Sequence, residues 1–413
     1  MITVEEAREL VLARIAALDT ERVALLDALG RVLGEDVVSD IDVAPFDNSA
    51  MDGYAVRAVD VADASADSPV VLDVVEYIPA GVAPTVTVAT GEASRIMTGA
   101  PMPEGADAVV MIERTEAGAA DGAPGGTVEI LAPVKAGENV RYRAEEVRAG
   151  EAVLVKGEVV GAAAIGLAAS VGHQTLTVNR RPRVAIVSTG DELVEVSERP
   201  GPGQIRNSNS YSLAAQVLAA GAEPHTLGIA RDNVEHTRSL LGRASEFDLM
   251  ITTGGVSMGD LDVVKGVLEE IGELEFWKVA MRPGAPQTFG TIGGTPFFGL
   301  PGNPTSTMVG FELFVRPAIR KMAGFATLDR PRVSATLSHD VRKKAARRYF
   351  MRARLTKVAD CTYSVAVSGN QSSALLTAMH RGNCLLSLPE GKDFFPAGCE
   401  VECIRLDMEE GTT

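Results

Sequence analysis

The chain has 413 residues, 46% of them hydrophobic, and a formal net charge of −16 at pH 7. Its length is typical of two to four domains, and its hydrophobic content is enough for several cores. The negative charge argues against a general nucleic-acid binder, because phosphate binding needs clustered Lys and Arg, and it fits a soluble cytoplasmic protein.

The N-terminal segment MITVEEARELVLARI predicts a capped amphipathic helix, because Thr3 and Glu6 have the spacing of a capping box. The segment lacks a basic start and an uninterrupted apolar core, so we expect no signal peptide. No apolar run in the chain approaches the roughly 20 residues of a membrane span, so we expect no membrane insertion.

The next part of the chain, residues 46–140, is rich in Val, Thr, Gly and Pro, which predicts a β-rich domain with frequent turns. Within it, the small and polar segment 116–126 is typical of an exposed hairpin loop. Residues 158–171 predict a helix of small residues. We expect this helix to pack against the N-terminal one, so that residues 1–45 and 141–180 form a discontinuous N-terminal domain.

Strands and helices alternate over residues 181–326, which predicts βαβ units with a parallel sheet. The last segment, residues 327–413, returns to short strands and turns and predicts a C-terminal β-domain. The expected fold class is therefore α/β plus β in a multidomain chain. Four strands are expected in PRVAIVSTG (182–190), EPHTLGIA (223–230), FDLMITTGG (247–255) and GTPFFGLPG (294–302).

Ligands of open parallel sheets bind beyond the carboxyl ends of the strands. This rule selects four loops, all with Gly and three with acids, as the predicted active site. They are residues 188–193, 228–233, 252–262 and 299–304.

The stretch ITTGGVSMGDLD (251–262) combines features for anions and for cations. Gly254 and Gly255 allow close approach of the backbone to a ligand, Ser257 adds a donor, and a following helix would point its amides at a phosphate. Asp262 lies near that helix start, where it could simply cap the helix. With Glu192 and Asp232 at the same sheet edge, however, the carboxylates suit Mg²⁺ bound to substrate phosphate.

Two further segments suggest anion binding, each with a structural alternative. GLPGNPTS (299–306) could form a second turn whose backbone amides bind an anion, like the turn at Gly254 and Gly255. Alternatively, it is a tight turn before a helix that Asn303 or Thr305 caps. Lys278 and Arg282 are four residues apart, so an extended segment would place both on one face, where they would bind a small oxyanion or face solvent.

Three remaining features are less specific. The run 341–354 has seven basic residues in fourteen, which favours a solvated strand face with one or two functional arginines over a nucleic-acid patch. Asp52 precedes a Gly in FDNSAMDGYAV (46–56), where a turn is the alternative to a functional site. The cysteines at positions 361, 384, 399 and 403 form no CxxC pair, which favours reduced thiols over a metal site.

Six motifs together resemble one family. PFDNSAMDGYAVR, RIMTGAPMPEGADAVV, RRPRVAIVSTGDEL, GGVSMGDLD, FWKVAMRPGAP and FGLPGNP occur in order and at fitting spacings. They are similar to the molybdopterin molybdenumtransferases, the MoeA family, and to the E domain of gephyrin, over essentially the whole chain. The resemblance implies an elongated, four-domain homodimer that uses adenylylated molybdopterin and molybdate, releases AMP and forms molybdenum cofactor with Mg²⁺. Candidate partners are the adenylyltransferase of the preceding step and cofactor-accepting apoenzymes.

The resemblance also implies roles for individual residues. Glu192, Asp232 and Asp262 match the acidic, Mg²⁺-binding cluster, and Lys278 and Arg282 match two basic catalytic positions. Molybdate would contact Lys278, Arg282, Arg352 and Ser373, with Ser372 as the neighbouring alternative to Ser373. Asp52 and Thr98 match positions that the partner subunit supplies. The substrate contacts would be Asp52, Thr98, Glu146, Ser188, Gly254, Gly255, Ser257, Pro301, Gly302 and Asn303.

The chain departs from the family pattern in two segments, at four positions. Ala144-Glu145-Glu146 stands where many members have Gly-Glu-Asp, and Arg282-Pro283-Gly284-Ala285-Pro286 replaces the usual Lys-Pro-Gly-Lys-Pro. Two other functions remain to be distinguished from the transferase: the adenylyltransferase of the preceding step, and a non-catalytic cofactor carrier or scaffold.

Overall fold

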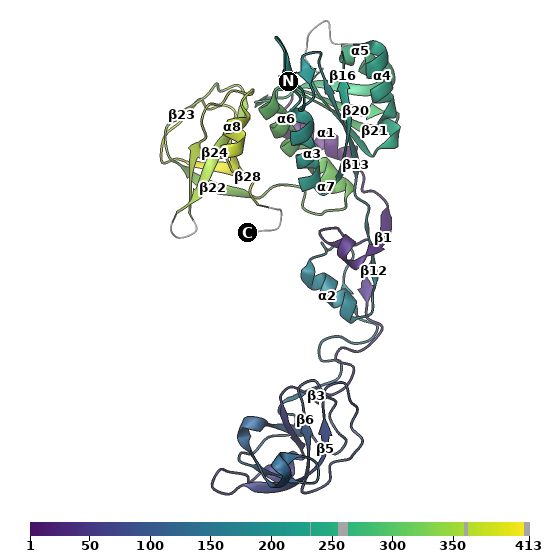
Figure 1. Ribbon diagram of the computed structural model, residues 1–413. Coiled ribbons are helices and arrows are strands. Elements are labelled where there is room, and N and C mark those ends of the chain that lie inside the picture. The colour runs from purple at the N-terminus through teal and green to yellow at the C-terminus, as the bar shows by residue number, and fades with distance from the viewer. Residues whose placement is uncertain (232, 255–262, 359–361, 409–413) are drawn as a thin grey trace. The chain divides into compact units, whose positions relative to one another are not determined.

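The computed structural model describes residues 1–231, 233–254, 263–358 and 362–408 (Figure 1). The chain forms two compact units. The first unit comprises Met1–Val23, Gly30–Gly34 and Thr177–Thr413, and the second comprises Ala24–Leu29 and Glu35–Leu176.

The first unit contains a six-stranded sheet in the order β16-β13-β17-β21-β20-β18. Its strands are β13 (Arg183–Thr189), β16 (Glu223–Ala230), β17 (Leu249–Thr253), β18 (Gly272–Lys278), β20 (Pro286–Ile292) and β21 (Thr295–Leu300). β16, β13, β17 and β21 are parallel, whereas β20 is antiparallel to both of its neighbours. All four strands expected from the sequence are present, and their carboxyl ends share one edge.

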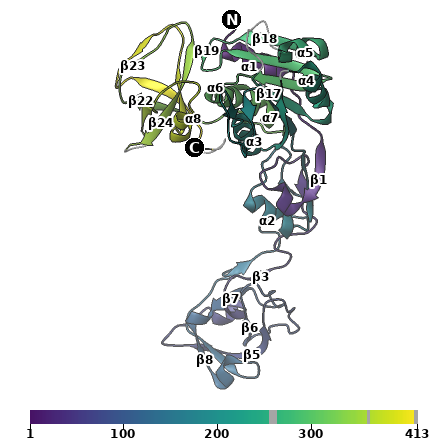
Figure 2. The same ribbon diagram turned by 45° about the horizontal axis from the view of Figure 1, so that its top comes forward.

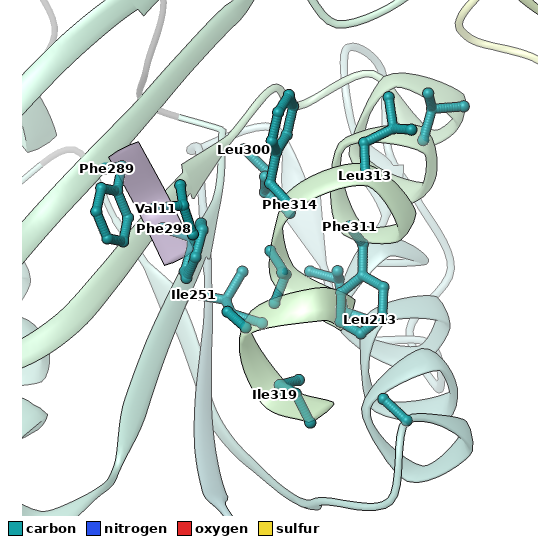
Figure 3. Close-up of a cluster of buried hydrophobic side chains, with 14 of the residues drawn as sticks. Val11, Leu213, Ile251, Phe289, Phe298, Leu300, Phe311, Leu313, Phe314 and Ile319 are labelled. Atoms are coloured by element: carbon teal, nitrogen blue, oxygen red, sulfur yellow. The ribbon is translucent and has the colours of Figure 1, made fainter. Parts of the chain in front are cut away.

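Helices cover both faces of this sheet (Figure 1 and Figure 2). They are α1 (Val4–Ala13), α3 (Asn209–Ala219), α4 (Val234–Leu241), α5 (Val263–Ile271), α6 (Pro304–Gly310) and α7 (Arg316–Met322), the last two joined by the π-helical η6 (Phe311–Val315). Alternate residues of a strand point to opposite faces, so Ile186 packs with α1, α3 and η6, and Ala185 packs with α4 and α5. Figure 3 shows the larger core, in which Phe289 and Phe298 lie beside Val11 of α1, and Phe311, Phe314 and Ile319 belong to the α6–α7 run.

The N-terminal helix is capped as predicted. The Thr3 hydroxyl accepts from the Glu6 amide, and the Glu6 carboxylate accepts from the Thr3 amide. The expected packing of this helix against residues 158–171 is wrong. Val4, Ala7 and Val11 are buried in the core of the first unit against α7 and η6, so the apolar stripe of α1 covers the α/β sheet.

A small barrel forms the rest of the first unit. β24 (Arg348–Lys357), β25 (Tyr363–Val367), β22 (Arg332–Leu337), β28 (Glu400–Arg405) and β26 (Cys384–Leu388) pair in this order, and β26 pairs back to β24. β19 (Met281–Arg282) extends it beside β24, and α8 (Leu376–Arg381) packs on it. Smaller pairs are β14 (Leu193–Val194) with β15 (Ile205–Arg206), and β23 (Val341–Arg342) with β27 (Phe394–Phe395). The barrel confirms the α/β plus β fold class.

Three of the cysteines lie in this barrel. Cys384 and Cys403 are buried in its core and Cys399 is half-buried, all as free thiols, and Cys361 lies outside the described residues. Burial and the neighbouring Cys403 thiol raise the pKa of Cys384, which keeps this group protonated.

The second unit contains a β-rich domain and a small helical part. Its main sheet has the order β7-β4-β6-β5-β9-β8, with β4 at Gly53–Val56, β5 at Val70–Ile78, β6 at Glu92–Ile96, β7 at Ala108–Met111, β8 at Thr115–Ala117 and β9 at Thr127–Ile130. The segment 116–126 forms the expected hairpin connection, between β8 and β9. The unit also contains η1 (Leu25–Ala28), β2 (Val37–Val38), β3 (Asn48–Ser49), β10 (Val140–Arg141), β11 (Ala152–Leu154) and α2 (Ala162–Ser170). β1 (Thr20–Ala24) pairs with β12 (Thr175–Asn179), and most residues of this pair belong to the first unit.

Among the described residues, no helix has the length and the apolar composition needed to cross a membrane.

Candidate functional site

A cavity of about 940 Å³ opens at the carboxyl edge of the parallel sheet. Strand order reverses between β13 and β17, and the loops after these two strands and after β21 line the cavity. This is the crevice where open α/β sheets bind ligands. Three of the four predicted loops thus meet at one site. The fourth begins at the same edge, where Ala230 lies opposite Thr189.

The loops approach one another closely because they carry glycine. Gly254 has φ +92°, and a Cβ built on it would lie 2.6 Å from Thr189 Oγ1. A Cβ on Gly302 would lie 3.5 Å from the Gly254 Cα, so the loops after β17 and β21 touch through their backbones. Both loops therefore present main-chain groups to the cavity, as an anion site requires.

The polar start of α3 holds these loops together, a role that the sequence did not indicate. Asn209 Nδ2 donates to Thr253 Oγ1 and to the Gly302 carbonyl, each at 2.8 Å. Two predicted contact residues also have partners within the fold: Ser188 is fully buried and donates to Asn207, and the Pro301 carbonyl accepts from the Thr307 hydroxyl.

The predicted capping of the helix after GLPGNP is also only partly right. Asn303 occupies the N-cap position, but its side chain makes no capping hydrogen bond. The Thr305 hydroxyl donates to the Leu375 carbonyl instead, so it ties the helix to the barrel.

Glu192 is an exposed carboxylate that lines the large cavity and makes no side-chain hydrogen bond among the described residues. Asp232, Asp262, Gly255 and Ser257 lie outside the described residues. The described part of the chain holds no group of three His, Cys, Asp or Glu side chains arranged for a metal.

A second cavity, of about 410 Å³, lies between β19 and the barrel and is lined by cations. We call it the cationic cavity. Five basic side chains line it, together with Tyr349 and Gln371 but no carboxylate: Arg282, Arg342, Lys343, Lys344 and Arg352. None of the five has a carboxylate within ion-pair distance in the described part of the chain.

Arg352 is the most deeply buried of these cations. Its side chain is 2% exposed, its Nη2 donates to the Ser372 carbonyl at 3.1 Å, and its Nε is buried without a partner. Burial, with the neighbouring charge of Arg282, lowers the pKa of Arg352 to about 10, so the group stays protonated at neutral pH. A buried cation without a counter-ion is costly, and a bound anion would relieve that cost.

A third cavity, of about 310 Å³, connects the other two through shared lining residues. Arg282, Pro283 and Gln371 line both it and the cationic cavity, and Asn303 lines both it and the large cavity. Ser373 and Arg347 also line it, whereas Ser372 makes its contact with Arg352 through its carbonyl.

The structure corrects two expectations about the basic residues. Lys278 ends β18 opposite Pro286, whereas Arg282 belongs to β19 beside the barrel, so the two are on different sheets and share no strand face. The run 341–354 is not simply a solvated face, because Lys343 is 9% exposed and Arg352 is 2% exposed. The sequence indicated the cationic cavity through the dense basic run and through Arg282, and closure of the barrel brings the two together.

Two predicted residues of the second unit contact each other directly. Asp52 Oδ1 accepts from the Thr98 amide and from the Thr98 hydroxyl, each at 2.8 Å. These two hydrogen bonds lower the pKa of Asp52, so the carboxylate is ionised and fixed. Glu146 is exposed, and Ala144, two residues before it, has φ +58°, a left-handed conformation that favours glycine.

The first unit can therefore bind two kinds of anion close together. A large crevice with backbone amides and a free carboxylate suits a phosphorylated ligand that is joined by a divalent cation. A smaller cavity with five cations suits a compact oxyanion. Residues shared with the third cavity link the two.

Comparison with known proteins covers nearly the whole chain. The family models "MoeA N-terminal region (domain I and II)", "Probable molybdopterin binding domain" and "MoeA C-terminal region (domain IV)" match residues 2–172, 185–321 and 334–406. Molybdopterin molybdenumtransferase 2 of Mycobacterium tuberculosis H37Rv is 41% identical over 409 residues, which is 97% of this chain and 99% of the relative. The molybdopterin molybdenumtransferase of Staphylococcus aureus COL is 36% identical over 99% of this chain and 96% of its own.

The fold comparison agrees with these matches. The crystal structure of the molybdopterin biosynthesis moeA protein from Pyrococcus horikoshii OT3 aligns with a TM-score of 0.81 and 31% identity. The alignment covers 98% of this chain and all of the other.

Proposed function

Because the chain belongs to the MoeA family of molybdopterin molybdenumtransferases, which are enzymes, we propose that it transfers molybdenum from molybdate to adenylylated molybdopterin, releases AMP and forms molybdenum cofactor. The observation that carries this proposal is the cationic cavity beside a nucleotide-sized crevice. An acidic chain that gathers five unpaired cations at one place has a binding site for a compact anion there.

The proposed roles follow from what each cavity offers. The large cavity binds the adenylylated substrate, with its phosphates near Gly254 and Gly302. Arg282 and Arg352 bind molybdate, with Ser373 as a neutral donor from the adjoining cavity. Lys278 is exposed at the end of β18. Its proposed role is that of a basic group near the substrate and not of a direct molybdate contact.

Mg²⁺ fits this proposal. Glu192 is a free carboxylate in the cavity, and a magnesium ion typically uses one or two carboxylates plus phosphate oxygens. Glu192, with Asp232 and Asp262, would hold the ion. When bound, the ion would neutralise the phosphoanhydride charge as AMP departs. The chain's own groups would orient the anhydride and keep molybdate next to it.

We further propose a homodimer in the cytoplasm. The helix α2 is almost wholly apolar, yet only Ala168 of its nine residues is buried. The elements that contact it expose Leu26 (78%) and Leu29 (52%), and Val159 after β11 is 53% exposed. Apolar side chains exposed on and beside one helix favour a protein interface, and a second copy of the chain is the proposed occupant. In the proposed dimer, Asp52 and Thr98 act in the site of the partner subunit.

Molybdate-dependent release of AMP tests the function. The full-length protein is incubated with adenylylated molybdopterin and Mg²⁺, and AMP is measured while molybdate is varied. For a transferase, the rate of AMP release rises with the molybdate concentration and then reaches a maximum. An adenylyltransferase of the preceding step would instead consume ATP, and a carrier would show no turnover. Either of those results would contradict the proposal.

A further inference from the structure

Tyr349 lines the cationic cavity and contacts two of its cations. It is the second residue of β24, its side chain is 9% exposed, and it lines the cavity beside Arg282 and Arg352. The guanidinium carbon of Arg282 lies 5.4 Å from the centre of its ring, and the Lys343 Nζ lies 5.2 Å from that centre. Two cations therefore contact one aromatic side chain.

The hydrogen bonds of the Tyr349 hydroxyl are only partly satisfied. Its oxygen accepts from Arg282 Nη1 at 3.3 Å and from the Lys344 amide at 3.4 Å. A tyrosine hydroxyl has two acceptor sites and one donor, so both acceptor sites are used. The hydroxyl hydrogen has no acceptor among the described residues, although the large majority of buried polar groups have partners.

We propose that Tyr349 binds the oxyanion: its hydroxyl donates to an oxygen of bound molybdate and at the same time holds Arg282 toward the same anion. The inference rests on the proposed molybdate site at Arg282 and Arg352. The other polar side chains that line the cavity are five cations and the amide of Gln371. Tyr349 adds a short, neutral donor whose position is fixed by the two groups that donate to it.

The proposed bond makes binding depend on pH in a defined direction. Burial raises the pKa of Tyr349, but the hydrogen bonds from Arg282 and from the Lys344 amide outweigh it, and the pKa lies below its usual value. Only the protonated hydroxyl can donate, so molybdate binding raises the pKa of Tyr349. By linkage, affinity for molybdate falls as the pH rises through the pKa of the free protein.

Other groups that face Tyr349 also titrate or carry charge. Lys343 loses its proton at a lowered pKa because it is buried, and Glu390 and Asp393 oppose this shift. The remaining groups around the cavity are arginines and Lys344. Lys343 and Tyr349 also influence each other's pKa, so the tyrosine is distinguished from the lysine by following its own titration in the ultraviolet.

The test measures molybdate binding to the full-length protein by calorimetry, for the wild type, Tyr349→Phe and Tyr363→Phe. Tyr363 is a matched control, because its hydroxyl accepts from Arg405 at 3.2 Å and the Arg405 guanidinium lies 5.5 Å from its ring, away from the cavity. We expect Tyr349→Phe to weaken molybdate binding about tenfold near neutral pH, equivalent to about 1.4 kcal/mol, and Tyr363→Phe to leave it unchanged.

An ultraviolet titration of tyrosinate supplies the second readout. One tyrosine should titrate at a lower pH than the others in the wild type, shift upward on addition of molybdate, and be absent from Tyr349→Phe. If Tyr349→Phe binds molybdate with wild-type affinity, or if the tyrosine titration does not change when molybdate is added, this inference is overturned but the proposed oxyanion site is not. A wild-type protein that binds no molybdate would overturn both the inference and the proposed oxyanion site.

Discussion

Two arginines of the first unit, Arg180 half-buried and Arg352 buried, illustrate the difference between a structural and a functional charge. Arg180 binds both oxygens of Asp248, at 2.7 Å and 2.8 Å, and its pKa rises because of that pairing. Arg352 has no carboxylate partner among the described residues, and burial lowers its pKa to about 10. The first arrangement stabilises the fold. The second leaves a buried cation without a counter-ion, which costs free energy until an anion binds.

Replacing Arg352 with methionine should therefore separate stability from function. We expect Arg352→Met to raise the free energy of unfolding by about 1–3 kcal/mol, because an apolar side chain replaces an unpaired buried cation. The same change should raise the molybdate concentration for half-maximal AMP release at least about tenfold. Denaturant unfolding and a molybdate titration measure the two effects, and calorimetry should show nearly unchanged AMP binding. A destabilised variant with a normal molybdate response would mean that Arg352 is structural.

Asp248→Asn should have the opposite effect on stability. Removing the carboxylate leaves Arg180 without its bidentate partner, and we expect a loss of about 1.5–3 kcal/mol. Burial raises the pKa of Asp248, but Arg180 and the Arg183 amide outweigh it and lower this pKa. The stabilisation is therefore present above the unfolded pKa of about 3.9 and is lost as the pH falls through the folded pKa. Denaturation at several pH values should show the difference from wild type disappearing in acid.

The exposed pair Arg243–Glu246 is the control for that experiment. Its side chains are 44% and 50% exposed, so Glu246→Gln should change stability little at any pH. An equal effect of both substitutions would show that burial of the Asp248 pair does not matter.

At the scale of the elements, local sequence patterns were sufficient for the parallel sheet and its loops. Apolar runs such as 182–190 and the capping box at Thr3 depend only on neighbouring residues, and both are confirmed. The cationic cavity could not be predicted in the same way. It requires the pairing of β19 with β24 and the closure of the barrel, which bring Arg282 beside the run 341–354. The partner of α1 was predicted wrongly for the same reason, because an apolar stripe does not specify which surface covers it.

Gly254→Ala tests the close approach of the loops. The backbone of Gly254 is in the left-handed region, and the new Cβ would lie 2.6 Å from Thr189 Oγ1 and 2.7 Å from the Thr189 carbonyl oxygen. We expect a loss of stability of about 1–3 kcal/mol and a strong loss of AMP affinity, because the loop that binds phosphate must move.

Gly294→Ala is the matched control for Gly254→Ala. Gly294 lies in the turn between β20 and β21, at the end of β21 opposite the cavity, and has φ +85°, but its added Cβ would meet nothing within 4 Å. It should show the cost of backbone strain without a clash, and AMP affinity should stay close to wild type. Similar AMP binding by both variants would contradict the proposed phosphate loop.

At the scale of the whole molecule, charge is distributed unevenly. The chain carries a net charge of −16, yet five cations surround one small cavity. If molybdate is the substrate, as proposed, the net charge of the chain would repel it and the cavity would attract it only at short range, since salt screens exposed charges beyond about 8 Å at physiological ionic strength. In the proposed function, binding of the oxyanion would therefore depend on the local arrangement of Arg282, Arg352 and Tyr349.

The proposed dimer is tested by placing charge on its apolar surface. Leu26 and Leu29 are 78% and 52% exposed beside α2, so Leu26→Asp with Leu29→Asp should leave the fold intact but disfavour a second copy at this surface. We expect light scattering to show monomers. Val71→Asp is the control, because Val71 is 57% exposed on β5, away from α2, and its variant should remain dimeric. If Asp52 acts in the partner's site, the monomer should lose AMP release but keep AMP binding. A dimeric double variant would exclude this surface, and a fully active monomer would show that each subunit works alone.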